Sequence, residues 1–268
     1  MPSDVRDPHL SLLSFKNARP PDGALAMRGE GCRAVILKFT ATRKNQDREW
    51  LSYELADSAV RKLNGFLDLE YCDPHTIPSF ENGRTISQEG RMRKRQIASL
   101  ARRVRADVVV VGSCYCDGDT IRADIQAMRP STHAVSAPLQ FERPADQICS
   151  LEEEMAIAIA DLLGYRLSER ERESLEACPT RSAVAFEELC KGRQAPEGSY
   201  GKIQHFQKAI AADPNCIEAR YLLGNAYCGI GTTYRYTEWF AMAIDEYGPE
   251  LCEDTLCNGG CRYDERAL

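Results

Sequence analysis

The stretch "DVVVVGSCYCDGDTIRADIQAM", residues 107–128, decides the fold of this chain. It begins with a nearly continuous apolar run rich in valine and ends with a run in which apolar and polar side chains alternate. An Asp-Gly-Asp turn, Asp117 to Asp119, separates the two runs. Asp-Gly between two strand-like runs is a strong signal for a β-hairpin. We therefore expect antiparallel strands at the centre of the chain.

Two strand–helix units precede this hairpin. Residues 32–39, "CRAVILKF", and 66–72, "FLDLEYC", are short apolar runs typical of buried strands. Each is followed by a segment with helical periodicity, 47–65 and 86–106. The buried stripes of these helices are predicted to contain Leu51, Leu55, Ala59 and Leu63 in the first and Ile97, Leu100, Ala101 and Val104 in the second.

A further strand around 134–141 and a helix over 146–163 follow the hairpin. The predicted order is βαβαβββα. Strands separated by helices and then a meander indicate an α/β (α+β) domain with a mixed sheet and helices packed on it.

The last third of the chain carries an internal period of 34 residues. It relates Leu189 to Leu223, Phe206 to Phe240, Ala209 to Ala243 and Ile210 to Ile244. A period of 34 is typical of tetratricopeptide (TPR) helix pairs. The second unit carries Leu223, Gly224 and Tyr227 at the L, G and Y positions of that motif, whereas the first has Cys190 for Gly and Arg193 for Tyr.

Changes in composition divide the chain into five parts. We expect a flexible tail over 1–31, the α/β domain over 32–165, a polar linker over 166–181, two TPR-like repeats over 182–249 and a Cys-rich tail over 250–268. Two repeats rarely stand alone, because each buries its apolar face on a neighbour. They are expected to lean on the α/β domain, on a second copy of the chain or on repeats elsewhere.

With both halves in view, the chain resembles the TolB amino-terminal-like (FlgO-like) domain followed by TPR repeats. "RAVILKF" is similar to the opening strand of that domain, and "ADVVVVGSCYCDGDTIRADIQAM" with the helix after it is similar to its later part. The loop "TATRKNQDREW" and Lys38 depart from the family pattern. The resemblance implies a non-catalytic sensory or scaffold piece that lacks an output domain.

Composition and motifs argue against several other classes. The net charge of −6 disfavours a protein that mainly holds nucleic acid, and no segment has the ~20 apolar residues of a membrane helix. The chain has no phosphate-binding Gly-rich loop, no G-x-S-x-G and no H-E-x-x-H. We therefore expect no enzymatic activity and no cofactor.

The twelve cysteines allow two interpretations. Without an export signal at the start, they are expected to be reduced thiols in a cytoplasmic protein. Cys252, Cys257 and Cys261, with Cys228 as a fourth ligand, would make a zinc site, but their spacing is not that of a typical ribbon or finger. No metal is therefore predicted.

Two surface features are candidate partner-binding sites. The second helix has a basic stripe opposite its apolar face, composed of Arg91, Lys94, Arg95, Arg102 and Arg105. It is either a solvated face or a dock for an acidic partner or phosphates. In the last repeat, Trp239 and Met242 form an apolar strip beside the inward-facing residues, which predicts a protein interface or a strip covered by the Cys-rich tail.

The function predicted from these features is that of a non-catalytic protein-interaction or scaffold protein. Its partner would be a peptide or helical segment, and a homo-oligomer through the last repeat is a further option. The alternative is a regulatory or sensory accessory part of a bacterial signalling system, of the nucleotide cyclase or winged-helix type, with its output domain on another chain.

Overall fold

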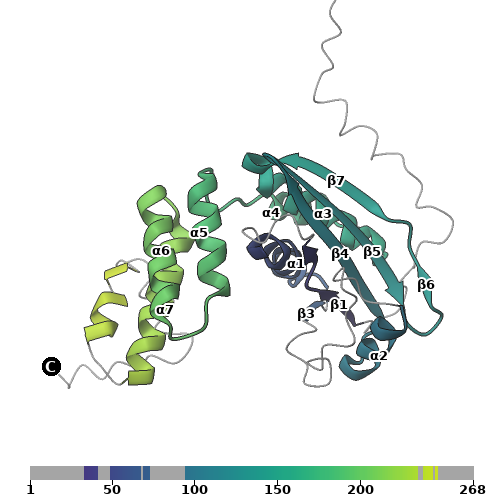
Figure 1. Cartoon of the computed structure of the whole chain (residues 1–268), viewed down its shortest axis with the longest axis horizontal. Coiled ribbons are helices and arrows are strands. Elements are labelled where there is room, and N and C mark those ends of the chain that lie inside the picture. The colour runs from purple at the N-terminus through teal and green to yellow at the C-terminus, as the bar shows by residue number, and fades with distance from the viewer. Residues whose placement is uncertain are drawn as a thin grey trace, which may run out of the picture.

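The computed structural model describes residues 33–41, 49–67, 69–72, 94–234, 238–243 and 245–246. It shows an α/β unit and, beside it, a helical segment (Figure 1). The α/β unit contains β1 (Ala34–Leu37), β2 (Thr40–Ala41), α1 (Glu49–Leu63), β3 (Leu69–Cys72), α2 (Lys94–Val104), β4 (Val108–Asp117), β5 (Thr120–Arg129), β6 (Ala134–Val135), β7 (Leu139–Pro144), the 3-10 turn η4 (Ala145–Gln147) and α3 (Ile148–Leu162). After it come α4 (Glu169–Leu175), α5 (Ala183–Gln194), α6 (Tyr200–Ala212) and α7 (Ile217–Tyr234), and residues 238–243 and 245–246 are also helical.

The sheet is mixed, with the order β3-β1-β4-β5-β6; β2 pairs with β4 and β7 pairs with β5. β1 lies parallel to β3 and β4, as expected for strands joined by helices. β4 and β5 form the long antiparallel hairpin, in which Asp117 faces Thr120 across the turn. Gly118 adopts a φ of 61° there, a left-handed conformation that glycine tolerates best.

The two faces of the sheet are covered by different helices. α1 and α3 pack against the side that carries Ile36, Val108 and Val110. α2 packs against the opposite side, which carries Val35 and Val109. Alternate residues of β1 and β4 therefore point to opposite layers, and these strands are apolar throughout because both of their faces are buried.

The predicted fold class is confirmed: a mixed-sheet α/β unit is followed by a helical segment. Two details differ from the sequence prediction. The expected strand over 134–141 is divided into β6 and β7, because Ser136 leaves the strand and its hydroxyl accepts a hydrogen bond from the Ala127 backbone N–H at 3.0 Å. The polar segment expected to be a linker contains α4, which begins with a capping box between Ser168 and Glu171.

The linker is also fastened by a disulfide. Cys149 at the start of α3 is bonded to Cys178, which follows α4. The expectation that all cysteines are reduced thiols is therefore wrong for this pair. Cys252, Cys257 and Cys261, which were weighed as zinc ligands and not predicted to bind metal, lie outside the described residues, as does Arg91.

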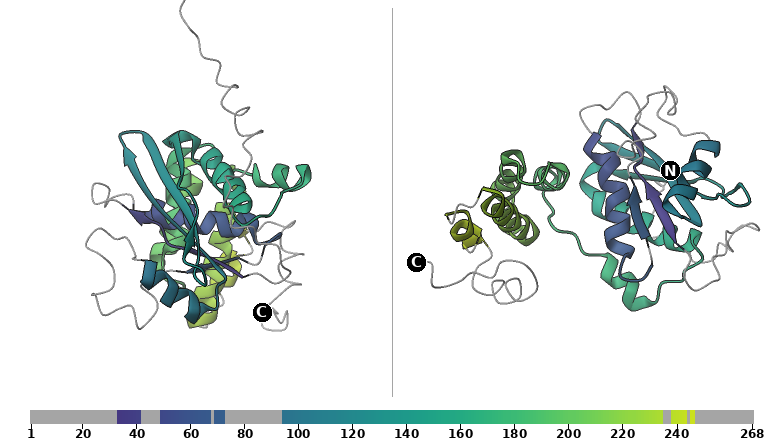
Figure 2. Two further views of the ribbon diagram at one scale, coloured as in Figure 1. Left: turned by 90° about the vertical axis from the view of Figure 1, so that its right-hand side faces the viewer. Right: turned by 90° about the horizontal axis from the view of Figure 1, so that it is seen from below.

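α5, α6 and α7 pack side by side with short connections, so that neighbours run antiparallel (Figures 1 and 2). Of the four first-unit residues of the 34-residue period, Leu189, Phe206 and Ala209 are buried and Ile210 is half-buried. Gly192 allows the closest approach: a Cβ at this position would lie 2.4 Å from the Phe206 ring. In the second unit Leu223 and Ala243 are also buried, whereas Phe240 is half-buried.

Candidate interaction surfaces

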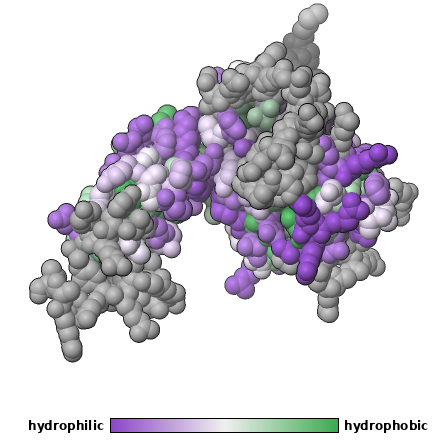
Figure 3. All heavy atoms as spheres, turned by 60° about the horizontal axis from the view of Figure 1, so that its bottom comes forward, coloured by the Kyte–Doolittle hydropathy of each residue, from purple (hydrophilic) through white to green (hydrophobic). Residues whose placement is uncertain are grey.

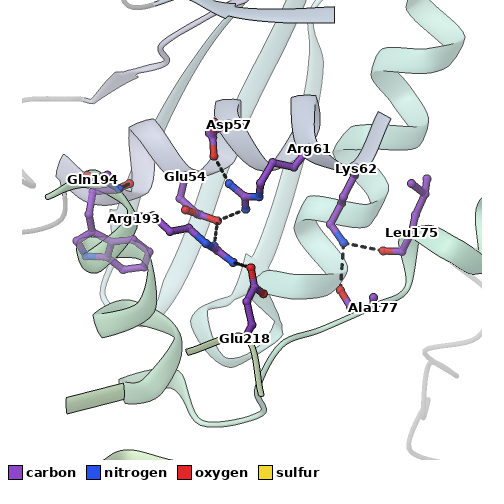
Figure 4. A network of polar contacts seen from close by, with 10 residues as sticks. Glu54, Asp57, Arg61, Lys62, Leu175, Ala177, Arg193, Gln194 and Glu218 are labelled. Carbon is purple, nitrogen blue, oxygen red and sulfur yellow. Dashed lines mark hydrogen bonds and ion pairs between the residues drawn. The ribbon is translucent and has the colours of Figure 1, made fainter. Parts of the chain in front are cut away.

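A network of charged side chains joins the helical segment to the α/β unit (Figure 4). Glu54 of α1 is completely buried, and its Oε1 accepts from Arg61 at 2.6 Å and from Arg193 of α5 at 2.7 Å. Arg193, with a side chain only 12% exposed, also donates to Glu218 of α7 at 2.6 Å. One guanidinium therefore connects α1, α5 and α7.

Apolar contacts and a backbone contact surround this network. Phe186 and Cys190 of α5 belong to the same core as α1 and α3. The rings of Trp50 and Phe186 lie 6.5 Å apart, and the Gln194 side chain donates to the Trp50 carbonyl at 2.8 Å. α5 therefore buries the face that carries Phe186 and Cys190 on the α/β unit. The sequence left three neighbours open for these helices: the α/β domain, a second copy of the chain or repeats elsewhere. In the structure α5 packs on the α/β domain.

The low dielectric of this joint changes the pKa values of its carboxyl groups. Burial, reinforced by the charge of Glu54, raises the pKa of Glu152 to about 8, while Lys62 and the two arginines of the network oppose the shift. Burial likewise raises the pKa of Asp57, although Arg61 beside it acts in the opposite direction. One carboxyl oxygen of Glu152 is buried without a hydrogen-bond partner. We infer that Glu152 is protonated near neutral pH.

The linker between the two units is held at three points. The Lys62 ammonium donates to the carbonyls of Leu175 at 2.6 Å and Ala177 at 3.2 Å. Thr180 donates to Asp213 at 2.5 Å, and the Cys149–Cys178 disulfide ties the segment to α3. Hydrogen bonds and a disulfide therefore hold the connection between the helical segment and the α/β unit.

The far end of the helical segment carries a row of aromatic side chains. The Trp239 ring lies 5.9 Å from that of Tyr200 and 5.6 Å from that of Tyr227. Gln207 donates to the Tyr227 hydroxyl at 3.0 Å, which fixes the inner end of the row. Tyr200 is 59% exposed and Met242 is 42% exposed. We call Tyr200, Trp239 and Met242 the aromatic surface.

One part of the sequence prediction for this end needs correction. Met242 is exposed, as expected for the apolar strip. Trp239 is instead half-buried, because it packs between two tyrosines of α6 and α7. The period of its own helix places Trp239 beside the inward-facing residues, but it does not contain the long-range contact with Tyr200 of α6.

The basic stripe of α2 is on the surface. Lys94, Arg95, Arg102 and Arg105 are all exposed, while Ile97, Leu100 and Ala101 are buried on the sheet. Three of these cations therefore lie on α2 and the fourth, Arg105, directly follows it, whereas the aromatic surface lies on the helical segment. The structure thus places the predicted partner-binding residues in two separate regions.

The charged joint was not predicted from the sequence. One signal was present: Glu54 lies beside Leu51 and Leu55 on the apolar stripe of α1, where an exposed carboxylate is not expected. A second was the replacement of the motif's Tyr by Arg193 in the first repeat. The sequence does not show that these two residues, which are 139 positions apart, form an ion pair.

The described residues contain neither a candidate metal site nor a candidate membrane span. No group of three or more His, Cys, Asp or Glu side chains in that part of the chain is arranged to hold a metal ion. In the same residues, every helix is too short or too polar to cross a membrane.

The comparisons with known proteins give no family. No family model and no curated protein matches the chain. Among solved structures, the PelC dodecamer from Paraburkholderia phytofirmans is 15% identical and covers 53% of this chain and 93% of that chain, with a TM-score of 0.35. The LpoB C-terminal domain from Escherichia coli is 12% identical and covers 50% and 93%, with a TM-score of 0.33. These scores are too low to carry an argument about function.

Proposed function

We propose that this chain is a non-catalytic protein-interaction protein whose helical segment binds a protein partner. The observation that carries the proposal is the distribution of exposed apolar side chains. Of the six large hydrophobic side chains that are exposed in the described residues, five lie on the helical segment: Val184, Tyr200, Ile217, Tyr221 and Met242. The α/β unit, which is about twice as long, contributes only Tyr115.

The aromatic surface is the best candidate for the contact. Tyrosine and tryptophan dominate the binding energy of many interfaces, because they bury large areas at a small cost in side-chain entropy. Methionine adds a flexible apolar side chain that adapts to the partner. Tyr200 and Trp239 are already held by ring contacts, so little ordering is required on binding.

The sequence resemblance supports the same proposal. TPR-like helix pairs commonly form surfaces for peptide or helical partners. The TolB-like α/β unit serves in this proposal as the support that covers the inner end of the repeats. The cytoplasmic location stays a prediction, and the Cys149–Cys178 disulfide weighs against it, because disulfides persist mainly in oxidising compartments.

Affinity capture followed by binding of the purified partner tests the proposal. The variant carries Tyr200→Ala and Met242→Ala; the matched control carries Gln204→Ala and Lys208→Ala, which are exposed positions of α6. We expect a partner captured by the wild type and by the control, with affinity for the variant reduced by about tenfold or more.

The proposal fails if no captured protein distinguishes the variant from the control. Light scattering on both variants separates a foreign partner from a second copy. A wild-type dimer that dissociates only in the Tyr200→Ala, Met242→Ala variant would identify the partner as this chain itself.

A further inference from the structure

The α2 side of the α/β unit carries a group of exposed cations. Lys94, Arg95 and Arg102 of α2 and Arg105 directly after it are exposed, whereas Ile97, Ala98, Leu100 and Ala101 are buried. Figure 3 shows strongly hydrophilic side chains gathered on this side of the α/β unit. We call Lys94, Arg95, Arg102 and Arg105 the basic face.

Arg61, Arg143 and Arg193 each form an ion pair with a carboxylate. None of the four residues of the basic face forms an ion pair with any side chain of the described residues. Among the described residues, no carboxylate therefore neutralises their charge.

The positions of two of these cations are also unfavourable for the stability of α2. The N-terminus of a helix carries a partial positive charge, so acidic residues are favoured in the first turn and basic residues in the last. α2 begins with Lys94 and Arg95 and has no acidic residue in its first turn. Arg102 near the other end agrees with the helix dipole, but the two residues at the start oppose it. Helix stability therefore does not account for the basic face.

The backbone conformation at the end of α2 is also one that arginine rarely adopts. Arg105 has a φ of 56°, a left-handed conformation that normally favours glycine. The backbone N–H of Ala106 donates to the Ala101 carbonyl at 2.8 Å, as in a Schellman cap, where glycine usually occupies the position of Arg105. An arginine at this position keeps a fourth positive charge on the same surface.

We propose that the basic face of α2 binds an acidic segment of a partner protein, independently of the aromatic surface. Arg95 and Arg102 are separated by two helical turns, about 10 Å along the axis. Carboxylates two turns apart on a partner helix, or a few residues apart on an extended chain, match this separation. Exposed arginines form bidentate hydrogen bonds with carboxylates.

Other anionic partners fit the surface less well. Single-stranded nucleic acid is normally held by aromatic side chains as well as cations, and α2 contains no aromatic residue. A helix that lies on a membrane inserts its apolar face, but the apolar residues of α2 are buried on the sheet.

Fluorescence anisotropy with a labelled poly-glutamate peptide tests the proposal on the full chain. The variant is Arg95→Glu with Arg102→Glu. The matched control, Arg170→Glu with Arg181→Glu, makes the same change of charge at exposed positions. We expect the wild type and the control to bind the peptide, and the variant to bind at least about tenfold more weakly.

Further measurements sharpen this test. Wild-type binding should weaken as salt is raised, and Arg95→Lys with Arg102→Lys should retain most of the affinity because it keeps both positive charges. An unchanged circular dichroism spectrum of the Glu variant excludes a loss through misfolding. Equal binding by the Glu variant and its control would overturn the proposal. Tighter binding of an oligothymidine or of phosphatidylserine vesicles than of poly-glutamate would also overturn it.

Discussion

The two ends of the helical segment pack against different neighbours and use different side chains to do so. Arg193 and Tyr227 are equivalent in the 34-residue period, yet Arg193 bridges two carboxylates and Tyr227 packs against an indole. At the inner end the neighbour is α1, which presents a buried glutamate. At the outer end the neighbour is the next helix of the segment, which presents Trp239.

This difference accounts for the change of residue between the two units of the 34-residue period. Cys190 and Arg193 of the first unit face the α/β unit. Tyr227, the counterpart of Arg193, instead packs on Trp239 of the helical segment. A residue of a periodic sequence therefore changes where its neighbour has another fold.

The largest expected effect tests whether the inner pair is packed more tightly than the outer one. Phe206 is 1% exposed and Phe240 is half-buried. Phe206→Ala should lower the free energy of unfolding by about 3–5 kcal/mol, and Phe240→Ala by about 1–2 kcal/mol. Urea denaturation followed by circular dichroism measures both, and equal losses would contradict the comparison.

The disulfide should stabilise the inner end specifically. Cys149 and Cys178 are 29 residues apart, and closing a loop of this length is worth about 3–4 kcal/mol in the chain-entropy treatment. Cys149→Ser with Cys178→Ser should lower stability by that amount. The double variant should also be cut faster by protease in the linker, residues 176–182. A linker that is cut at the same rate in both proteins would show that the other two contacts hold it.

The buried ion pair of the inner end should be worth more than the partly exposed one of the outer end. Arg193→Ala leaves Glu54 buried with Arg61 alone and should cost about 3 kcal/mol. Arg220 pairs with Glu246 at 3.7 Å, with side chains 42% and 26% exposed, and Arg220→Ala should cost less than about 1 kcal/mol. Thermal or urea unfolding of the two variants under the same conditions tests this difference.

The inner end should also make stability depend on pH. The folded pKa of Glu152 is raised to about 8, above the ordinary value of 4.5. Between these values the folded state keeps a proton that the unfolded state loses, so its contribution to stability falls as pH rises, by about 1 kcal/mol per pH unit. Glu152→Gln should remove this slope, measured as the difference in unfolding free energy from wild type between pH 5 and 8.

The exposed Glu173 provides the control for this measurement. Glu173→Gln should leave the slope of the wild type unchanged, because the Glu173 side chain is exposed on α4 and lies outside the buried joint. An unchanged slope in Glu152→Gln would show that another group of the joint carries the proton.

Much of the fold follows from local sequence pattern. The Asp-Gly turn and the alternation in residues 120–128 are enough to predict the hairpin, because a period of two places one set of side chains on the core. The predicted stripes of α1 and α2 are buried as expected, with Val104 at the edge of its stripe. The exposed cations of α2 follow from the same helical period.

The joint between the units was decided only by the tertiary structure. Hydrophobic periodicity indicates which face of a helix is buried, as it does for α1 and α2. It does not tell which element covers that face, because apolar contacts are non-directional. The pairing of Glu54 with Arg193, the half-burial of Trp239 and the Cys149–Cys178 bond each join residues distant in sequence. Their energies depend on burial and distance, which arise only once the chain has folded.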